Sequence, residues 1–433
     1  PMQELVPELP GPMFPRTLSA RRTPMAKVRG LQMHLLHPLE YLRTLHEPGE
    51  ANLAEARKLI DWLVKTGQNH LQWPLLGSAP WDGFRDHARR IIEYAHSRGV
   101  TVGCMVQLFE KASLQRAFVL VQDETQLDAQ LSQNGERLMQ VPWDEVEFAM
   151  GEFFAEDPDV LVRMLDAATA KVLALKPDTR IGVHNHVGNY PNLYPTYRGQ
   201  RTYFYHLPQY ADPRIGQTVH TLFWFDLYRP GGMYKHTDFA FQRDFIFAQL
   251  STARRVRYFP ESAYWIGTDI DVPAFLPEFI ESRWTDIHRL NQDIRAKGLP
   301  PLDGHITFSS GHEWGYWLTD YLVAKMLWEP EAPLERFLSH YTQSFGSCGP
   351  SMQESLGKFV ELQRRYLFEQ NLVPYLSGED HTVDLGATAG IEIRTPRVPF
   401  HQLATAPEAD RAAFEAQVLA PLGAFTAESK LLE

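Results

Sequence analysis

The chain has 433 residues, of which 44% are hydrophobic and 22% are charged, so it can bury a large core in one or two domains. Its formal net charge of -11 argues against nonspecific binding to nucleic acid or to an anionic membrane, because both require a cationic surface. The two cysteines, Cys104 and Cys348, form no CxxC pair and no apolar run reaches about 18 residues, so the sequence predicts no zinc knuckle, disulfide framework or membrane span.

The chain opens with a proline-rich segment, residues 1–26, that lacks the apolar centre of a secretory signal. The sequence leaves the compartment open between the cytoplasm and export with a leader that has been removed. We treat this segment as separate from the folded part of the chain.

Short apolar runs then alternate with amphipathic helical segments, a pattern typical of strand and helix units around a parallel sheet. Eight strands are predicted at 27–36, 70–76, 100–109, 145–154, 180–188, 217–227, 255–262 and 304–315. Helices are expected at 52–67, 81–99, 113–139, 158–177, 238–253 and 274–298, with an aromatic loop at 189–215.

Eight such units indicate an α/β fold of the (β/α)8 TIM-barrel type, spanning residues 27–319. An open doubly wound sheet would carry a glycine-rich phosphate turn after its first strand, and neither GxGxxG nor GxxxxGK occurs. Residues 320–433 contain further helical segments, from which we expect a mostly helical C-terminal domain.

In a closed barrel the C-terminal ends of the strands meet on one face, where catalytic side chains are expected. Carboxylates stand at four of these ends: Glu152 after the fourth strand, Asp226 after the sixth, Glu261 after the seventh and Glu313 after the eighth. The first strand adds His34, and the fifth adds His184, Asn185 and His186.

Aromatic residues are dense around the same strand ends: Trp73, Trp224, Tyr264, Trp265 and Trp314. Flat rings stack on the apolar C–H faces of sugars, while carboxylates, amides and imidazoles hydrogen-bond sugar hydroxyls. Cleavage of a glycosidic bond needs two carboxyl groups, one protonated and one ionised. Glu152 and Glu261, on nearly opposite strands, are predicted to face each other across the pocket, with the histidines, Asn185, Asp226, Glu313 and the aromatics binding substrate.

A glutamate after strand four and another after strand seven resemble the arrangement of retaining glycoside hydrolase barrels. The phrases "NHLQW", "HARRIIEYAHSRGV" and "LVAKMLWEPEAPLERFLSHYTQSFG" are also similar to alpha-glucuronidase and beta-hexosaminidase-type barrels. The resemblance implies that Glu152 is the acid/base and Glu261 the nucleophile. Gly151 stands where the strand-four motif usually has asparagine, and the Asp-Glu pair of the hexosaminidases is missing there.

The sequence therefore predicts a glycosidase that acts on an oligo- or polysaccharide without a cofactor or metal. Its expected partner is the carbohydrate substrate, with no nucleic acid and no membrane. The sugar, the anomer, retention or inversion, internal or terminal cleavage, and the oligomeric state stay open.

Two other enzyme classes use similar residues. A metal-dependent, amidohydrolase-like hydrolase could use the strand-end histidines, including His220, although no HExxH helix is present. A polysaccharide lyase could use Tyr264 or His184 as a base beside Asn185. A third class, a carbohydrate-binding barrel without activity, would be expected to lack one of the four carboxylates.

Overall fold

The computed structural model describes residues 23–35, 40–109, 117–232, 234–262, 275–309, 314–370, 372 and 404–432. Three of the predicted site residues, Tyr264, Trp265 and Glu313, lie outside the described residues. Trp314 is described as the first residue of a helix, without its side chain.

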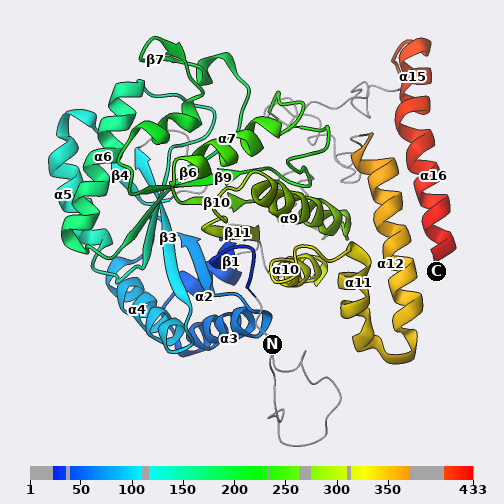
Figure 1. Cartoon of the computed structure of the whole chain (residues 1–433), viewed down its shortest axis with the longest axis horizontal. Coiled ribbons are helices and arrows are strands. Elements are labelled where there is room, and N and C mark those ends of the chain that lie inside the picture. Colours follow the sequence, from blue (N-terminus) through cyan, green and yellow to red (C-terminus); the bar gives the residue numbers. More distant parts are fainter. Residues whose placement is uncertain are drawn as a thin grey trace, which may run out of the picture.

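Eight parallel strands close into a barrel, which confirms the predicted (β/α)8 fold (Figure 1). Closure comes from β1 (Val28–Met33) pairing with β11 (Gly304–Ser309), which brings Val28 beside Gly304. A ninth strand, β4 (Val119–Val121), extends the sheet outside β3. The barrel strands are β1 (Val28–Met33), β2 (His70–Pro74), β3 (Thr101–Phe109), β5 (Glu145–Ala149), β6 (Arg180–Asn185), β9 (Ile215–His220), β10 (Val256–Phe259) and β11 (Gly304–Ser309).

Helices form the outer layer, and several of them carry an apolar stripe that packs against the strands. In α3 (Glu50–Thr66) the buried residues Leu53, Ala56, Ile60 and Leu63 recur at helical spacing. The helix stops at Gly67, whose φ of 84° suits glycine. The other outer helices are α2 (Glu40–His46), α4 (Trp81–Ser97), α5 (Leu127–Leu138), α6 (Pro158–Leu175), α7 (Ala240–Ser251), α9 (Glu278–Ala296) and α10 (Trp314–Met326).

The predicted helix 113–139 is wrong in its first half. Within its described residues, 117–139, the chain forms β4 and then the shorter helix α5. The run Val119-Leu120-Val121 is short and rich in β-branched residues, which favours a strand. The side chain of Asp123 then accepts a hydrogen bond from the Thr125 backbone N–H and begins a new helical turn.

Between β6 and β9 the described chain forms no α-helix. It makes two 3-10 helices, η2 (Pro191–Leu193) and η3 (Phe204–Tyr210), and a small hairpin of β7 (Thr196–Tyr197) with β8 (Gln200–Arg201). This excursion is the aromatic loop of the sequence.

The base of the barrel interior is charged. Arg257 on β10 forms two hydrogen bonds with Glu145 on β5, and its Nε lies 3.3 Å from a carboxylate oxygen of Asp303. Burial raises the pKa of Glu145, but Arg257 and His70 outweigh burial and hold that pKa below its usual range. The ion pair therefore joins opposite sides of the barrel below the pocket.

We expect Arg257→Met to lower the free energy of unfolding by up to about 3–5 kcal/mol, because the buried Glu145 carboxylate loses two hydrogen bonds and keeps Arg180, 3.7 Å away, as a weaker partner. Chemical denaturation at neutral pH measures the loss. The loss should shrink as the pH falls below the usual carboxylate pKa, since protonated Glu145 needs no cation. The matched control is Arg295→Met, which removes an exposed ion pair with Glu331 and should cost less than about 1 kcal/mol.

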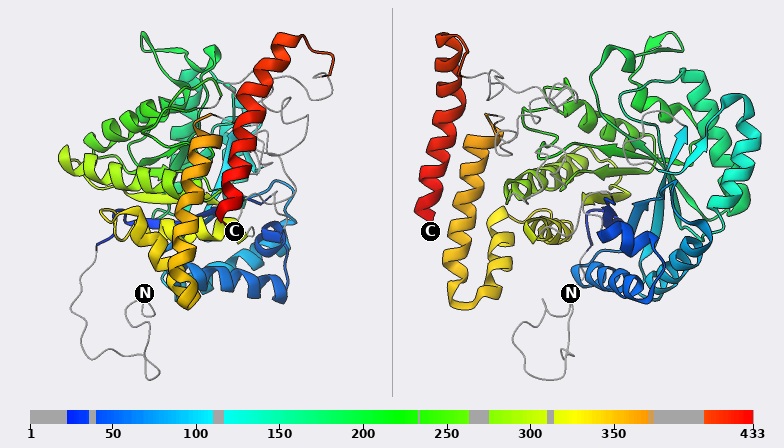
Figure 2. Two further views of the ribbon diagram at one scale, coloured as in Figure 1. Left: turned by 90° about the vertical axis from the view of Figure 1, so that its right-hand side faces the viewer. Right: turned by 180° about the vertical axis from the view of Figure 1, so that it is seen from behind.

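In its described residues, 320–370, 372 and 404–432, the C-terminal region is mostly helical, as predicted, with its longest helices forming a column beside the barrel (Figure 2). Gln363 ties this column to α9, because its side chain accepts from the Glu278 backbone N–H at 3.2 Å. Helix α10 spans the expected domain boundary at 319/320. The region contains α11 (Leu334–Thr342), α12 (Gly349–Gln363), α15 (Glu408–Phe414) and α16 (Ala420–Ser429). Among the described helices, none has both the length and the apolar character needed to cross a membrane.

Candidate active site

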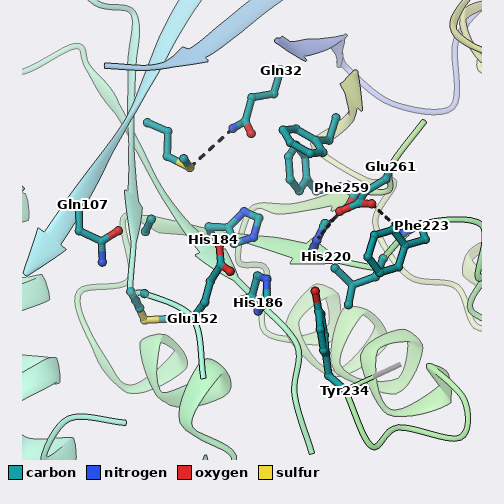
Figure 3. A pocket seen from close by; sticks show the side chains of 16 residues that line it. Gln32, Gln107, Glu152, His184, His186, His220, Phe223, Tyr234, Phe259 and Glu261 are labelled. Atoms are coloured by element: carbon teal, nitrogen blue, oxygen red, sulfur yellow. Dashed lines mark hydrogen bonds and ion pairs between the residues drawn. The ribbon is translucent and has the colours of Figure 1, made fainter. Parts of the chain in front are cut away.

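A pocket opens at the C-terminal ends of the barrel strands, where the sequence predicted the site (Figure 3). Glu152 and Glu261 both line it, together with three histidines and a mixture of amide and aromatic side chains. The lining residues are Gln32, Met105, Gln107, Ala149, Met150, Gly151, Glu152, His184, His186, His220, Leu222, Phe223, Tyr234, Phe259, Glu261 and Phe308.

Glu152 is held in a sharply bent segment just after β5. The residues on either side, Gly151 and Phe153, both have positive φ angles, 83° and 58°. The Tyr205 hydroxyl pins this bend, since it accepts from the Phe153 backbone N–H at 2.8 Å and donates to the Gly151 carbonyl at 3.2 Å. Burial, together with the charge of Glu261, raises the pKa of Glu152 to about 8. Glu152 is therefore protonated at neutral pH and can act as a general acid.

Glu261 lies in a different environment, although it faces the same pocket. It is 3% exposed and lies two residues beyond the last residue of β10. The Phe223 backbone N–H donates to its Oε2 at 2.8 Å, and His220 Nε2 lies 3.3 Å from its Oε1. These two contacts fix the orientation of the Glu261 carboxyl group at the pocket, as a nucleophile or a base requires.

His220 has a defined orientation. Its Nδ1 lies 2.8 Å from the Phe259 carbonyl oxygen, which can only accept, so Nδ1 carries a proton. Nε2 is then the nitrogen that faces Glu261 (Figure 3).

A buried cation outside the pocket fixes the backbone around Glu261. The guanidinium of Arg283, on α9, donates to the carbonyls of Glu261 at 2.8 Å and of Phe223 at 3.3 Å. It also donates to the Phe225 carbonyl and is paired with Asp286. Arg283 therefore joins the end of β10, which carries Glu261, to the loop after β9, which carries Phe223. These two residues are the partners in the hydrogen bond to the Glu261 carboxyl group.

The remaining polar lining can bind hydroxyl groups. Burial lowers the pKa of His184 and His186, so both are neutral imidazoles at neutral pH. Their ring centres lie 5.8 Å apart, and the His184 ring lies 4.9 Å from that of His220. Burial raises the pKa of Tyr234, which keeps its hydroxyl protonated. Among the described residues, no group of three or more His, Cys, Asp or Glu side chains is placed to hold a metal ion.

Several predicted substrate contacts lie outside the pocket lining. Strand side chains alternate between the barrel interior and the helical layer. Gln72 points inward to Glu147, so Trp73 points outward, where its ring packs 5.3 Å from that of Trp143. Asn185 also lies behind the pocket, donating to the Tyr205 carbonyl and to Gln217.

Trp224 and His34 also lie behind the residues that line the pocket. Trp224 is 2% exposed and meets Phe368 edge-on at 5.3 Å, in the layer between the barrel and the C-terminal helices. His34 is 1% exposed and contacts Phe308, whose ring lines the pocket. Neither belongs to the pocket lining.

Asp226 holds a loop together. Its Oδ1 accepts from the backbone N–H groups of Tyr228 and Arg229 at 2.8 and 2.7 Å, and its Oδ2 is bonded to the Arg229 side chain. Arg229 also pairs with Glu278 and Glu281. These contacts account for a structural role, and Asp226 is not part of the pocket lining.

We expect Asp226→Asn to lower the free energy of unfolding by about 1–3 kcal/mol, because a charged hydrogen bond to the partly buried Arg229 is lost. Thermal unfolding measures the change. Turnover at room temperature should stay close to that of the wild type. A selective loss of turnover without a loss of stability would return Asp226 to the active site.

Some lining residues were not predicted as site residues. Gln32 and Gln107 face inward near the ends of β1 and β3, and strand alternation at the mouth is the signal that could have found them. His220 is one of the strand-end histidines expected either to bind a metal or to bind sugar hydroxyls and orient the carboxylates, and the structure places its Nε2 3.3 Å from Glu261. Tyr234 comes from the loop after β9, and nothing in its local sequence marks it.

No protein-family model and no curated protein sequence matches the chain. Among solved structures, an exo-beta-N-acetylglucosaminidase of glycoside hydrolase family 20 from Vibrio harveyi is 10% identical, with 77% of this chain and 59% of that chain covered and a TM-score of 0.44. A sugar phosphate isomerase/epimerase from Parabacteroides distasonis is 14% identical, with 73% and 99% covered and a TM-score of 0.41. An alpha-galactosidase from Saccharomyces cerevisiae is 10% identical, with 71% and 64% covered and a TM-score of 0.41. These neighbours differ in activity from one another, so they assign none to this chain.

Proposed function

We propose that the protein is a glycoside hydrolase that cleaves a glycosidic bond with Glu152 as general acid/base and Glu261 as nucleophile. One observation carries the proposal: two carboxyl groups from distant parts of the chain line one pocket, and the pKa of one of them is raised. Glu152 is protonated because burial and a neighbouring charge raise its pKa to about 8. Glu261 accepts a hydrogen bond from the Phe223 backbone N–H, which orients its carboxyl group toward the bound substrate. Glycosidic cleavage needs two carboxyl groups with different roles, one that protonates the leaving oxygen and one that attacks the anomeric carbon or activates water.

In the first step Glu152 transfers its proton to the leaving glycosidic oxygen, while a carboxylate oxygen of Glu261 bonds to the anomeric carbon. The bond between that carbon and the leaving oxygen breaks, and the leaving sugar departs as an alcohol. In the second step the Glu152 carboxylate takes a proton from water, and the water oxygen displaces Glu261. Both carboxyl groups return to their starting states, and the anomer is retained.

The rest of the lining suits a neutral sugar ring. His184, His186 and Tyr234 offer neutral donors and acceptors to hydroxyls, and Gln32 and Gln107 add amide groups. The rings of Phe223, Phe259 and Phe308 supply apolar faces. The pocket therefore offers hydrogen-bonding groups to the hydroxyls of a sugar and aromatic rings to its apolar faces.

A panel of aryl glycosides, covering both anomers of common hexoses, pentoses and uronic acids, tests the proposal. Hydrolysis of one class is expected, and NMR of the first product resolves its anomer. Retention supports Glu261 as a nucleophile, whereas inversion would make it a base that activates water. Inactivation by a chelator with recovery on adding zinc would replace the proposal with a metal-dependent hydrolase.

A further inference from the structure

A third carboxylate, Glu147, lies inside the barrel and has no part in the cleavage described above. It stands on β5 between Glu145 and the pocket and is 1% exposed. Gln72 donates to its Oε2 at 3.1 Å, and the Thr218 hydroxyl donates to the same oxygen at 3.3 Å. Within the described part of the chain, no lysine or arginine forms an ion pair with it. Among the described residues its other oxygen, Oε1, has no hydrogen-bond partner.

The unsatisfied oxygen faces an unsatisfied nitrogen. His184 Nδ1, on the neighbouring strand β6, lies 3.5 Å from Glu147 Oε1. It too is buried, and the described part of the chain offers it no hydrogen bond. Leaving two such buried groups unpaired is unfavourable, and a small approach would join them in one hydrogen bond. The His184 ring is held in place, since Phe259 meets it edge-on at 5.0 Å.

We propose that Glu147 and His184 form a buried carboxylate–imidazole dyad, which keeps the proton on Nδ1 and presents an unprotonated Nε2 to a hydroxyl of the bound ligand. His184 lines the pocket, and 11% of its side chain is exposed there. An imidazole whose Nδ1 donates to a carboxylate has its tautomer set by that bond. Glu147 is then a positioning residue that acts through His184.

The dyad differs from the other pocket histidines. His220 is oriented by the Phe259 carbonyl and directs its Nε2 at Glu261. His186 Nδ1 lies 2.9 Å from the Val187 carbonyl. His184 thus has a carboxylate behind the ring and, among the described residues, no hydrogen-bond partner for Nε2, which leaves that nitrogen for a ligand.

The protonation of Glu147 depends on the groups that face it. Burial and the charge of Glu145 raise its pKa to about 7, while Gln72, Arg257 and Thr218 act in the opposite direction. His184 stays neutral, since burial and His220 lower its pKa. Above the pKa of Glu147 the carboxylate accepts from Nδ1–H. Below it the added proton lies between Oε1 and Nδ1, and the imidazole proton moves to Nε2.

Nitrogen-15 NMR of the histidine rings in the full chain tests the dyad without any substrate. His184→Gln identifies the His184 signals by their loss. At a pH about two units above the Glu147 pKa, we expect the proton of His184 on Nδ1. A proton on Nε2 at that pH would overturn the proposal.

Glu147→Gln adds a second, independent readout. Gln72 and Thr218 both donate to the Oε2 position, so the amide oxygen belongs there and the amide NH2 faces His184. The variant should therefore move the His184 proton from Nδ1 to Nε2, whereas an unchanged tautomer would refute the dyad. The matched control is Thr218→Val, which removes one donor to Oε2 and leaves Oε1 in place; its His184 tautomer should stay that of the wild type.

The role in turnover rests on the proposed function and is measured separately. In a glycoside assay, Glu147→Gln should lower kcat/KM about 10–100-fold, the usual effect of losing a partner that orients a functional imidazole. If the tautomer reverses but no glycoside is cleaved by any form, the dyad stands and the glycosidase proposal falls. If glycosides are cleaved and the tautomer does not reverse, only the dyad falls.

Discussion

Glu261→Gln is expected to lower kcat by about 10³-fold or more, because an amide can neither attack the anomeric carbon nor take a proton from water. The fold should tolerate the change. The amide oxygen can still accept from the Phe223 N–H, and the amide NH2 can donate to His220 Nε2. The melting temperature should therefore stay close to that of the wild type. Kinetics on the preferred aryl glycoside and a thermal melt of the same preparation give both numbers.

Two further variants sharpen this result. Glu261→Gly leaves space for a small anion, and added azide should restore cleavage and give a glycosyl azide of the opposite anomer. Asp226→Asn is the matched control, since it changes an acid after the neighbouring strand that does not line the pocket. A large fall in the melting temperature of Glu261→Gln, with turnover retained, would make Glu261 a structural residue.

Glu152→Gln is expected to lower kcat by about 10²–10⁴-fold on substrates with a poor leaving group, because the general acid is lost. Substrates whose leaving group needs no proton, such as dinitrophenyl glycosides, should lose far less in the first step. Comparison of the two substrate types in one assay separates loss of acid catalysis from general damage. The matched control is Glu156→Gln, four residues along the same segment and outside the pocket lining, which should keep wild-type rates on both.

The pH profile gives a second test of Glu152. Its pKa is raised from 4.5 to about 8, and the protonated form is the active one, so wild-type activity should fall as the pH rises through about 8. That alkaline limb should disappear in Glu152→Gln. Persistence of the limb in the variant would assign it to another group.

The same raised pKa has a consequence for stability. Folding takes up a proton at Glu152 between pH 4.5 and about 8, so this residue's contribution is present at acid pH and is lost as the pH rises through that window. Glu152→Gln has no such loss. Relative to wild type, the variant should gain stability between pH 5 and pH 9, by an amount on the order of 1 kcal/mol or more. Denaturant unfolding at the two pH values measures the gain.

Much of the architecture follows from local sequence patterns. All eight barrel strands were predicted from apolar runs, since a strand buried on both faces needs a short apolar segment between polar turns. The shared mouth of Glu152 and Glu261 follows from a rule of the fold, because parallel strands point their C-terminal ends the same way. Their proposed roles rest on the resemblance and on the pocket, and activity measurements decide them.

Contacts between distant segments decided which aromatic residues line the pocket. Aromatic residues near the strand ends look alike in sequence, yet Trp73 and Trp224 pack outward while Phe259 lines the pocket, because strand alternation and helix packing select the face. Counting the aromatic residues near the strand ends therefore overestimates how many of them line the pocket.

By itself the sequence determined the barrel, the order of its strands and the end at which acidic side chains gather, because these depend on residues close together along the chain. Only the tertiary structure decided how those acids behave. The Tyr205 hydroxyl pins the bend at Glu152 from 53 positions away, and Arg283 fixes the backbone of Glu261 from the helix that follows it. The protonation of a carboxyl group depends on its burial and on charges that the fold brings near it. The residues next to it in the sequence determine neither of these.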